Sequence, residues 1–295
     1  GHHAGKHGLI KDCISCGFCI FNNVMVGAVH ALERYPEVVT RVAIIDVDVH
    51  HGNGTEEIVR ERATSHPNQV FFFSIHLYQP QHTGIPDTYE FYPGTGGVDL
   101  MRENVVNIPI CPAWSSSKAQ GPGKRTRTSV KTEEKETVSG DGYDDVFRKC
   151  TGRSYFRSQI SSRLLPTLRA YSPDLILLSM GFDGADGDVG NQNIWLDGCP
   201  CGLDLSPEDY KWATEEISAV ADVVCNGRVV SVLEGGYGSR GFRKVGDQSV
   251  MTLDRGTLVD ASASHVRGLI GSDSFYRPPL RSARSGRLLA GPAGP

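Results

Sequence analysis

Residues 42–55 read VAIIDVDVHHGNGT, and this stretch decides the fold that we predict for the chain. Its first half is a run of apolar, largely β-branched residues, which is typical of a strand buried in a parallel sheet. Its second half contains two glycines and an asparagine, which end a strand and open a loop. We therefore predict a buried strand over residues 42–49 that carries polar residues to the edge of a sheet.

Three polar side chains stand at every second position along the end of this strand: Asp46, Asp48 and His50. Because strand side chains alternate between two faces, we expect all three on one side of the sheet. Two neighbouring carboxylates repel each other, and burying them is costly unless a cation or hydrogen bonds compensate. Carboxylate oxygen and imidazole nitrogen suit zinc or manganese, so the spacing favours a metal site over a solvated strand end.

The composition is ordinary for a globular protein. The chain has 295 residues, of which 39% are hydrophobic and 22% charged, and its net charge is -4. This length suits a single α/β domain, and the charge provides no overall attraction to nucleic acid or to anionic membranes. No apolar run approaches the roughly 18 residues of a membrane span, and no secretory signal is recognisable. We therefore expect neither direct nucleic-acid binding nor a membrane partner.

Three of the eight cysteines form a C-x2-C-x2-C run, namely Cys13, Cys16 and Cys19. Such a run is also found in zinc and iron–sulfur sites. No second pair follows at the expected spacing, and Cys19 lies inside an apolar run, so we interpret these cysteines as small buried or loop residues. In a chain of this length without a secretory signal, the cysteines are expected to be reduced.

Strands and helices are predicted to alternate along most of the chain. Strands are expected at 42–49, 69–76, 105–110, 174–180 and 228–233, and helices at about 24–32, 55–63, 156–168 with a kink at Pro166, and 207–225. This alternation predicts an α/β fold with a mostly parallel central sheet and helices on both faces. Ligands bind outside the carboxyl ends of such strands. The polar residues expected to meet there are Asp46, Asp48, His50, Ser74, His76, Asp183 and Tyr237.

Two segments lack the apolar residues that a core needs. Residues 112–145 are dense in mixed charge and are predicted to be a disordered insertion, and residues 274–295 are predicted to be an unstructured tail. The insertion contains three basic residues, Lys124, Arg125 and Arg127. We interpret them as part of a solvated loop rather than as a nuclear import signal. A domain is therefore expected over residues 1–273.

Six segments, in this order, resemble the zinc-dependent histone deacetylases and their acetylpolyamine-hydrolysing relatives. They are GHHAG at 1–5, GFCIFNN at 17–23, IIDVDVHHGNGT at 44–55, FYPGTG at 91–96, LLSMGFDGADGD at 177–188 and LEGGYG at 233–238. The asparagine of HHGNGT is similar to the class II branch. The resemblance implies an arginase/deacetylase-like fold, hydrolysis of acetyl-lysine amides on histones or other proteins, corepressor-type protein partners, and a location in the nucleus and/or cytoplasm.

The resemblance also implies which residues form the metal site and stabilise the reaction. One Zn²⁺ would be held by Asp48, His50 and Asp183, with positions left open for water and the acetyl oxygen. Tyr237 would donate its hydroxyl to the developing oxyanion. Tyrosine at this position predicts competence on acetyl-lysine, because some class II relatives carry histidine there and are weak on that substrate.

A tandem pair of histidines would move the proton. His3, paired with Asn53, would act first as general base and then as general acid, since histidine titrates near neutral pH. His2, paired with Asp46, would be its electrostatic partner. Both histidines lie close to the first residue of the chain.

The family also has aromatic walls and a second ion near the zinc. Phe18 and Tyr92 match the two aromatics that line the acyl-lysine tunnel of the family. The resemblance further implies a structural K⁺ site, for which the matching residues are Asp46, Asp48, His50, Ser74 and Ile75.

The match departs from the family in two further places. Family members carry early strands before GHHAG, so we expect a partial domain whose N-terminal part is missing. The loop 191–202 is also longer than usual.

Three alternative functions stay open. An acetylpolyamine amidohydrolase would need an acidic gatekeeper near Gly190. An arginase-like enzyme with two manganese ions would need a second carboxylate-rich cluster. An inactive, truncated deacetylase domain would act as an interaction scaffold.

Overall fold

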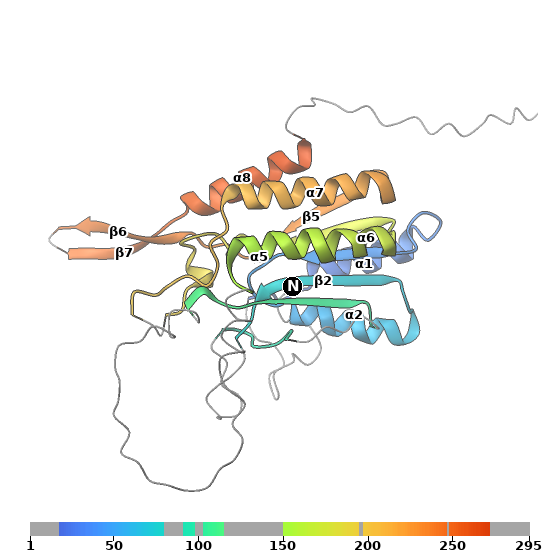
Figure 1. Cartoon of the computed structure of the whole chain (residues 1–295), viewed down its shortest axis with the longest axis horizontal. Helices are drawn as coiled ribbons and strands as arrows, with labels where there is room; N and C mark the ends of the chain where they lie inside the picture. The colour runs from blue at the N-terminus through green and yellow to red at the C-terminus, as the bar shows by residue number, and fades with distance from the viewer. Residues whose placement is uncertain are drawn as a thin grey trace, which may run out of the picture.

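A five-stranded parallel sheet forms the centre of the molecule (Figure 1). The structure, a computed structural model, describes residues 18–79, 91–97, 103–114, 150–194, 197–246 and 248–271. The strands are β1 (Val42–Asp46), β2 (Val70–Leu77), β3 (Val105–Ile110), β4 (Leu175–Met180) and β5 (Val229–Leu233), in the order β3-β2-β1-β4-β5. The predicted α/β fold with a mostly parallel sheet is confirmed.

Helices cover both faces of this sheet (Figure 1). They are α1 (Asn23–Arg34), α2 (Asn53–Ser65), α5 (Gly152–Gln159), α6 (Leu165–Tyr171), α7 (Pro207–Cys225) and α8 (Gly256–Ile270). Alternate strand residues point into two separate cores, as the period of two requires. Ile44 and Phe72 pack with α1 and α2, whereas Ile45 and Phe73 pack with α5, α6 and α7.

Strand β1 ends at Asp46, so the prediction of a strand over residues 42–49 was wrong by three residues. The Oδ1 atom of Asp46 accepts a hydrogen bond of 3.1 Å from the backbone N–H of Asp48. An aspartate that binds the backbone two residues further on favours a turn over a continued strand. The chain nevertheless stays close to its neighbours, because Val47 N donates to Ser179 O and Leu77 N donates to Val49 O.

The helical segment before β4 is less regular than predicted. The expected kinked helix over residues 156–168 is divided into α5, a π-helical turn (Ile160–Leu164) and α6. Pro166 lies in the first turn of α6, where its missing N–H costs little. The irregularity therefore precedes the proline. Helix α7 has the predicted bounds, and Ser206 and Asp209 form a capping box at its start.

Most of the predicted insertion and the whole predicted tail lie outside the described residues. Residues 112–114, at the start of the segment 112–145, are described, and Trp114 is 1% exposed, so the prediction of disorder was wrong for these three residues. Its indole N–H donates to Gln79 Oε1 at 2.8 Å. Among the described helices, none is long and apolar enough to cross a membrane.

An antiparallel hairpin and a final helix follow β5, and the sequence patterns did not predict them. The hairpin consists of β6 (Ser239–Val245) and β7 (Gln248–Asp254) and extends away from the body of the molecule (Figure 1). Helix α8 packs against α7. Its buried His265 joins three elements, because its ring nitrogens lie 2.7 Å from Thr214 Oγ1 of α7 and 2.8 Å from Ser231 Oγ of β5.

His265 is expected to make the fold sensitive to acid. Burial lowers the pKa of His265 to about 4 from an ordinary value of 6.5. As the pH falls, the unfolded chain therefore protonates His265 before the folded chain does. The contribution of neutral His265 to the free energy of unfolding is lost as pH falls from about 6.5 to 4. We expect the melting temperature of the natural protein to fall over this range by about 2–4 °C more than that of His265→Gln.

The matched control for this titration is His66→Gln, because His66 is exposed. Thermal melts of the three proteins at several pH values separate His265 from the carboxylates, which titrate in all of them. Parallel curves for the natural protein and His265→Gln would contradict the prediction.

Candidate metal centre

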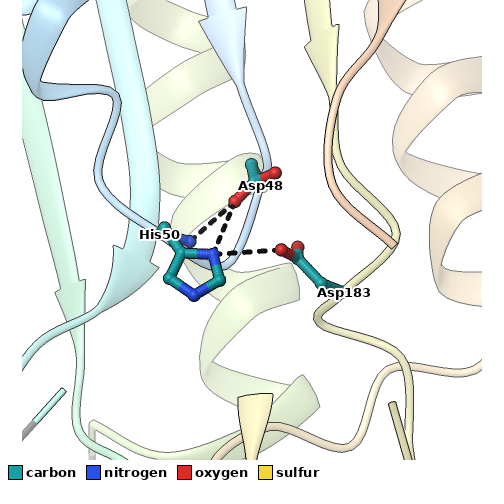
Figure 2. A group of neighbouring side chains, drawn as sticks. All are labelled: Asp48, His50 and Asp183. Carbon is teal, nitrogen blue, oxygen red and sulfur yellow. Dashed lines mark hydrogen bonds and ion pairs between the residues drawn. The ribbon is translucent and has the colours of Figure 1, made fainter. Parts of the chain in front are cut away.

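Three potential metal ligands meet at the carboxyl ends of two neighbouring strands (Figure 2). Asp48 and His50 lie in the loop after β1, and Asp183 lies in the loop after β4. One ligand atom from each lies within 4.8 Å of the others. His50 Nδ1 is 3.1 Å from Asp48 Oδ1 and 3.0 Å from Asp183 Oδ2. The expected convergence occurs because β1 and β4 are parallel and adjacent.

Backbone N–H groups hold the two carboxylates in place. Asp183 Oδ1 accepts a hydrogen bond of 3.0 Å from Val49 N, and Asp48 Oδ2 accepts one of 2.8 Å from Gly235 N. Asp48 Oδ1 also accepts from His50 N at 2.9 Å. Such outer contacts orient ligands before a metal arrives. The loops after β1, β4 and β5 are thus joined at one site.

Two glycines allow these loops to approach the carboxylates closely. A Cβ atom at Gly181 would lie 2.2 Å from Asp48 Oδ2, and one at Gly235 would lie 2.3 Å from Asp183 Oδ2. Both distances are far below van der Waals contact. Only glycine therefore fits at these two positions while the carboxylates keep their places.

The site concentrates negative charge in a buried place. Asp48 and Asp183 have no exposed surface. Burial, together with the charge of Asp48, raises the pKa of Asp183 to about 6. Burial alone would lower the pKa of His50, but its hydrogen bonds to Asp183 and Asp48 outweigh this and raise it to about 9. The group therefore favours a positive charge between the carboxylates, and two carboxylates with one imidazole fit Zn²⁺.

Tyr237 lies in the loop after β5, and Asp188 holds that loop. Asp188 Oδ2 accepts from Tyr237 N at 2.9 Å and from Gly238 N at 2.7 Å, and its Oδ1 accepts from Gly190 N at 2.7 Å. Burial and the charge of Asp183 raise the pKa of Tyr237, so its phenol stays protonated and able to donate. No role was predicted for Asp188, although GFDGADGD carries two aspartates besides Asp183, which was a signal.

The predicted partners of the tandem histidines are both fully buried. Asp46 ends β1, and its carboxylate lies against Gly52, where a Cβ atom would be 2.3 Å from Asp46 Oδ2. It does not belong to the three-residue group of ligands described above. Asn53 is the first residue of α2. His2 and His3 lie outside the described residues, so the two pairings stay predictions.

The two predicted tunnel aromatics lie beside the site. The ring centroid of Tyr92 is 6.0 Å from that of His50, and the ring of Phe18 meets Tyr237 edge-on at 6.2 Å. Phe18 is 84% exposed. For the predicted K⁺ site, Ser74 pairs with Asp46 across β1 and β2, and its Oγ lies 2.9 Å from His76 Nδ1. Potassium at this place stays a prediction.

The described cysteines are free thiols. Cys19 lies near the site, and its Sγ donates to Glu234 Oε2 at 3.6 Å. Cys13 and Cys16 fall outside the described residues, so the interpretation of the C-x2-C-x2-C run stays a prediction.

The sequence is similar to those of several known proteins. Residues 1–253 match the family model described as "Histone deacetylase domain". The chain is 35% identical over 242 residues to Type-2 histone deacetylase 2 of Dictyostelium discoideum, covering 81% of this chain and 11% of that protein. It is 32% identical over 247 residues to Histone deacetylase clr3 of Schizosaccharomyces pombe, covering 80% and 26%.

A solved structure is similar in fold. The HD domain of HDA15 gives a TM-score of 0.54 at 23% identity, covering 90% of this chain and 52% of that one. The chain spans 11%, 17% and 21% of the lengths of three of the similar curated proteins, so it corresponds to only part of each.

Proposed function

Because the chain belongs to the histone deacetylase family, we propose that it carries a zinc-dependent lysine deacetylase site that hydrolyses acetyl-lysine amides on histones or other proteins. The observation that supports this most is the group of Asp48, His50 and Asp183, gathered at one buried point. Nuclear or cytoplasmic residence and corepressor-type partners are further predictions from the family.

Each part of the proposed site has a separate task. A Zn²⁺ ion held by the three ligands would supply Lewis acidity for attack on an amide carbonyl. The N–H groups of Val49 and Gly235 keep the two carboxylates oriented. Tyr237 donates its hydroxyl to the carbonyl oxygen as negative charge develops there. We propose His3 as the base that takes a proton from the attacking water and returns it to the lysine amine.

The surroundings of Gly190 disfavour the polyamine alternative. A Cβ atom at this position would lie 2.7 Å from Asp183 Cβ and 2.8 Å from the ring of Tyr237. An acidic gatekeeper therefore has no room at position 190. The nearby Asp188 is already bound to three backbone N–H groups, which leaves it unsuited to binding a polyamine ammonium.

The arginase-like alternative gains no support either. Two manganese ions need a second set of carboxylate ligands. In the described part of the chain, one group of His, Cys, Asp and Glu side chains has metal-ligand spacing. The interaction-scaffold alternative is left to experiment.

Zinc content and turnover together test the proposal. We expect the protein to bind one zinc ion and to hydrolyse an acetyl-lysine peptide at least about tenfold faster than an acetylated polyamine. The measurements are metal analysis after dialysis and release of acetate. A protein that binds zinc but leaves the peptide intact would contradict the deacetylase proposal and favour the scaffold.

A further inference from the structure

The segment 91–97 lies directly on the metal centre. The ring of Phe91 stacks on that of His50, with centroids 5.1 Å apart and an angle of 13° between the planes. The next residue, Tyr92, is the aromatic that we propose for the tunnel wall. Whatever holds this segment therefore also sets where Tyr92 stands relative to His50.

Two histidines that have no part in the proposed mechanism hold the other end of the segment. His51 Nδ1 lies 2.8 Å from Thr95 Oγ1, and His76 Nε2 lies 3.2 Å from Gly96 O. Both histidines are fully buried, and their ring centroids are 4.5 Å apart. Two consecutive residues of the segment are thus bound by two neighbouring imidazoles.

The other nitrogen of the His51 ring faces a carboxylate. Its Nε2 lies 2.9 Å from Glu56 Oε2 of α2, a close ionic contact rather than an aligned hydrogen bond. Glu56 also accepts from Asn107 Nδ2 at 2.8 Å and faces Arg60 at 3.6 Å. The charge of this carboxylate favours a proton on Nε2, which leaves Nδ1 of a neutral ring to accept from the Thr95 hydroxyl. The contact of Thr95 is therefore a directed hydrogen bond.

The ring of His76 is oriented in the same way. The carbonyl oxygen of Gly96 can only accept, so Nε2 of His76 carries the proton and donates it. Its Nδ1 then accepts from the Ser74 hydroxyl, 2.9 Å away on the same strand. Each imidazole uses one nitrogen for the scaffold and the other for the segment.

The backbone of Gly96 rests on both rings. Its φ is +80°, and a Cβ atom there would lie 2.5 Å from His76 Nε2 and 2.7 Å from His51 Cδ2. A side chain would therefore push the segment away from the two histidines. This close contact is a second observation, independent of the hydrogen bonds, that the histidines set the position of the segment.

We propose that His51 and His76 form a clasp that positions the segment 91–97, and with it Tyr92, over the metal centre. His51 and His76 contact the segment and have no part in the proposed chemical step, so they are positioning residues, and they determine how tightly the site holds the acyl-lysine side chain. The effect on binding of acyl-lysine rests on the proposed function, whereas the clasp itself rests on the hydrogen bonds and contacts described above.

The first test compares Thr95→Val with Thr95→Ser. Valine removes the hydroxyl at nearly constant shape, whereas serine keeps it. We expect Thr95→Val to speed backbone hydrogen exchange within residues 91–97 about tenfold and to raise KM several-fold, with kcat and zinc content within about twofold of the natural protein. Thr95→Ser should keep the exchange rate and the KM of the natural protein. Equal exchange and equal KM in the two variants would overturn the proposal.

The second test uses glycines of matched conformation. Gly96→Ala is expected to speed exchange in residues 91–97 and to raise KM, whereas Gly198→Ala should do neither. Gly198 has φ +77° and no atom within 4 Å of an added Cβ, so it controls for backbone strain. If the natural protein leaves the peptide intact, the deacetylase proposal fails, while the exchange rates of the Thr95 variants still decide whether the clasp exists.

Discussion

Asp183→Asn is expected to abolish stoichiometric zinc binding and to lower deacetylase turnover by more than about 10²-fold, which exceeds the loss usually caused by removing an outer partner of a metal ligand. Asp183 is fully buried, and its Oδ2 lies 3.0 Å from His50 Nδ1. Asparagine removes one of the two charges that balance the cation. It also turns an amide N–H₂ group or a weaker carbonyl oxygen toward the metal.

The fold should survive this change, because asparagine has nearly the same shape as aspartate. Its carbonyl oxygen can still accept from Val49 N, as Asp183 Oδ1 does at 3.0 Å. The measurements are zinc content after dialysis, the circular dichroism spectrum, and release of acetate from a peptide. Asp186→Asn is the matched control, since Asp186 lies in the same loop and is exposed. Wild-type zinc content in Asp183→Asn would remove Asp183 from the proposed ligand set.

The gathering of the metal ligands could be predicted because it follows from sheet topology. Two strands, at 42–46 and 175–180, are each followed within three residues by an aspartate, and parallel neighbours bring such ends to one edge. The sequence did not reveal that Asp46 would bend the chain two residues before Asp48. That turn depends on one hydrogen bond from the Asp48 N–H, which has no periodic signature.

The hairpin and α8 were missed for a different reason. The buried face of α8 consists of Ala261, Ser264, His265 and Gly268, which give almost no apolar signal. Small residues are needed there because α8 lies so close to α7 that a Cβ atom at Gly268 would be 2.9 Å from Lys211 O. In the hairpin every residue described in β7 is exposed, so no buried face imposes an alternating pattern.

The sequence patterns also did not predict the two carboxylates that support the site, Asp188 and Glu56. Asp188 and Glu56 bind backbone N–H groups and side chains from segments far away in the chain, as in the contacts of Asp188 with Tyr237 and of Glu56 with Asn107. Such pairings depend on how loops after different strands meet. They become visible only when those loops are placed side by side.

Tyr237→Phe is expected to lower kcat by about 10²- to 10³-fold, which corresponds to about 2.7–4 kcal/mol, while zinc content and peptide KM change little. The phenol is the one group of this loop that we assign to the oxyanion. Burial and the charge of Asp183 raise its pKa, so it enters the reaction as a donor. Phenylalanine keeps the ring and its edge-on contact with Phe18 at 6.2 Å, so the change removes the hydroxyl alone.

The loop that carries residue 237 should keep its position in this variant, because Asp188 binds the backbone of Tyr237 and Gly238 rather than the phenol. A loss of kcat with unchanged zinc therefore reports on the hydroxyl and not on collapse of the site. Tyr35→Phe, an exposed tyrosine after α1, is the matched control and should keep full activity. If Tyr237→Phe retains the natural kcat, the developing charge must be stabilised by another group, and the role proposed for Tyr237 is wrong.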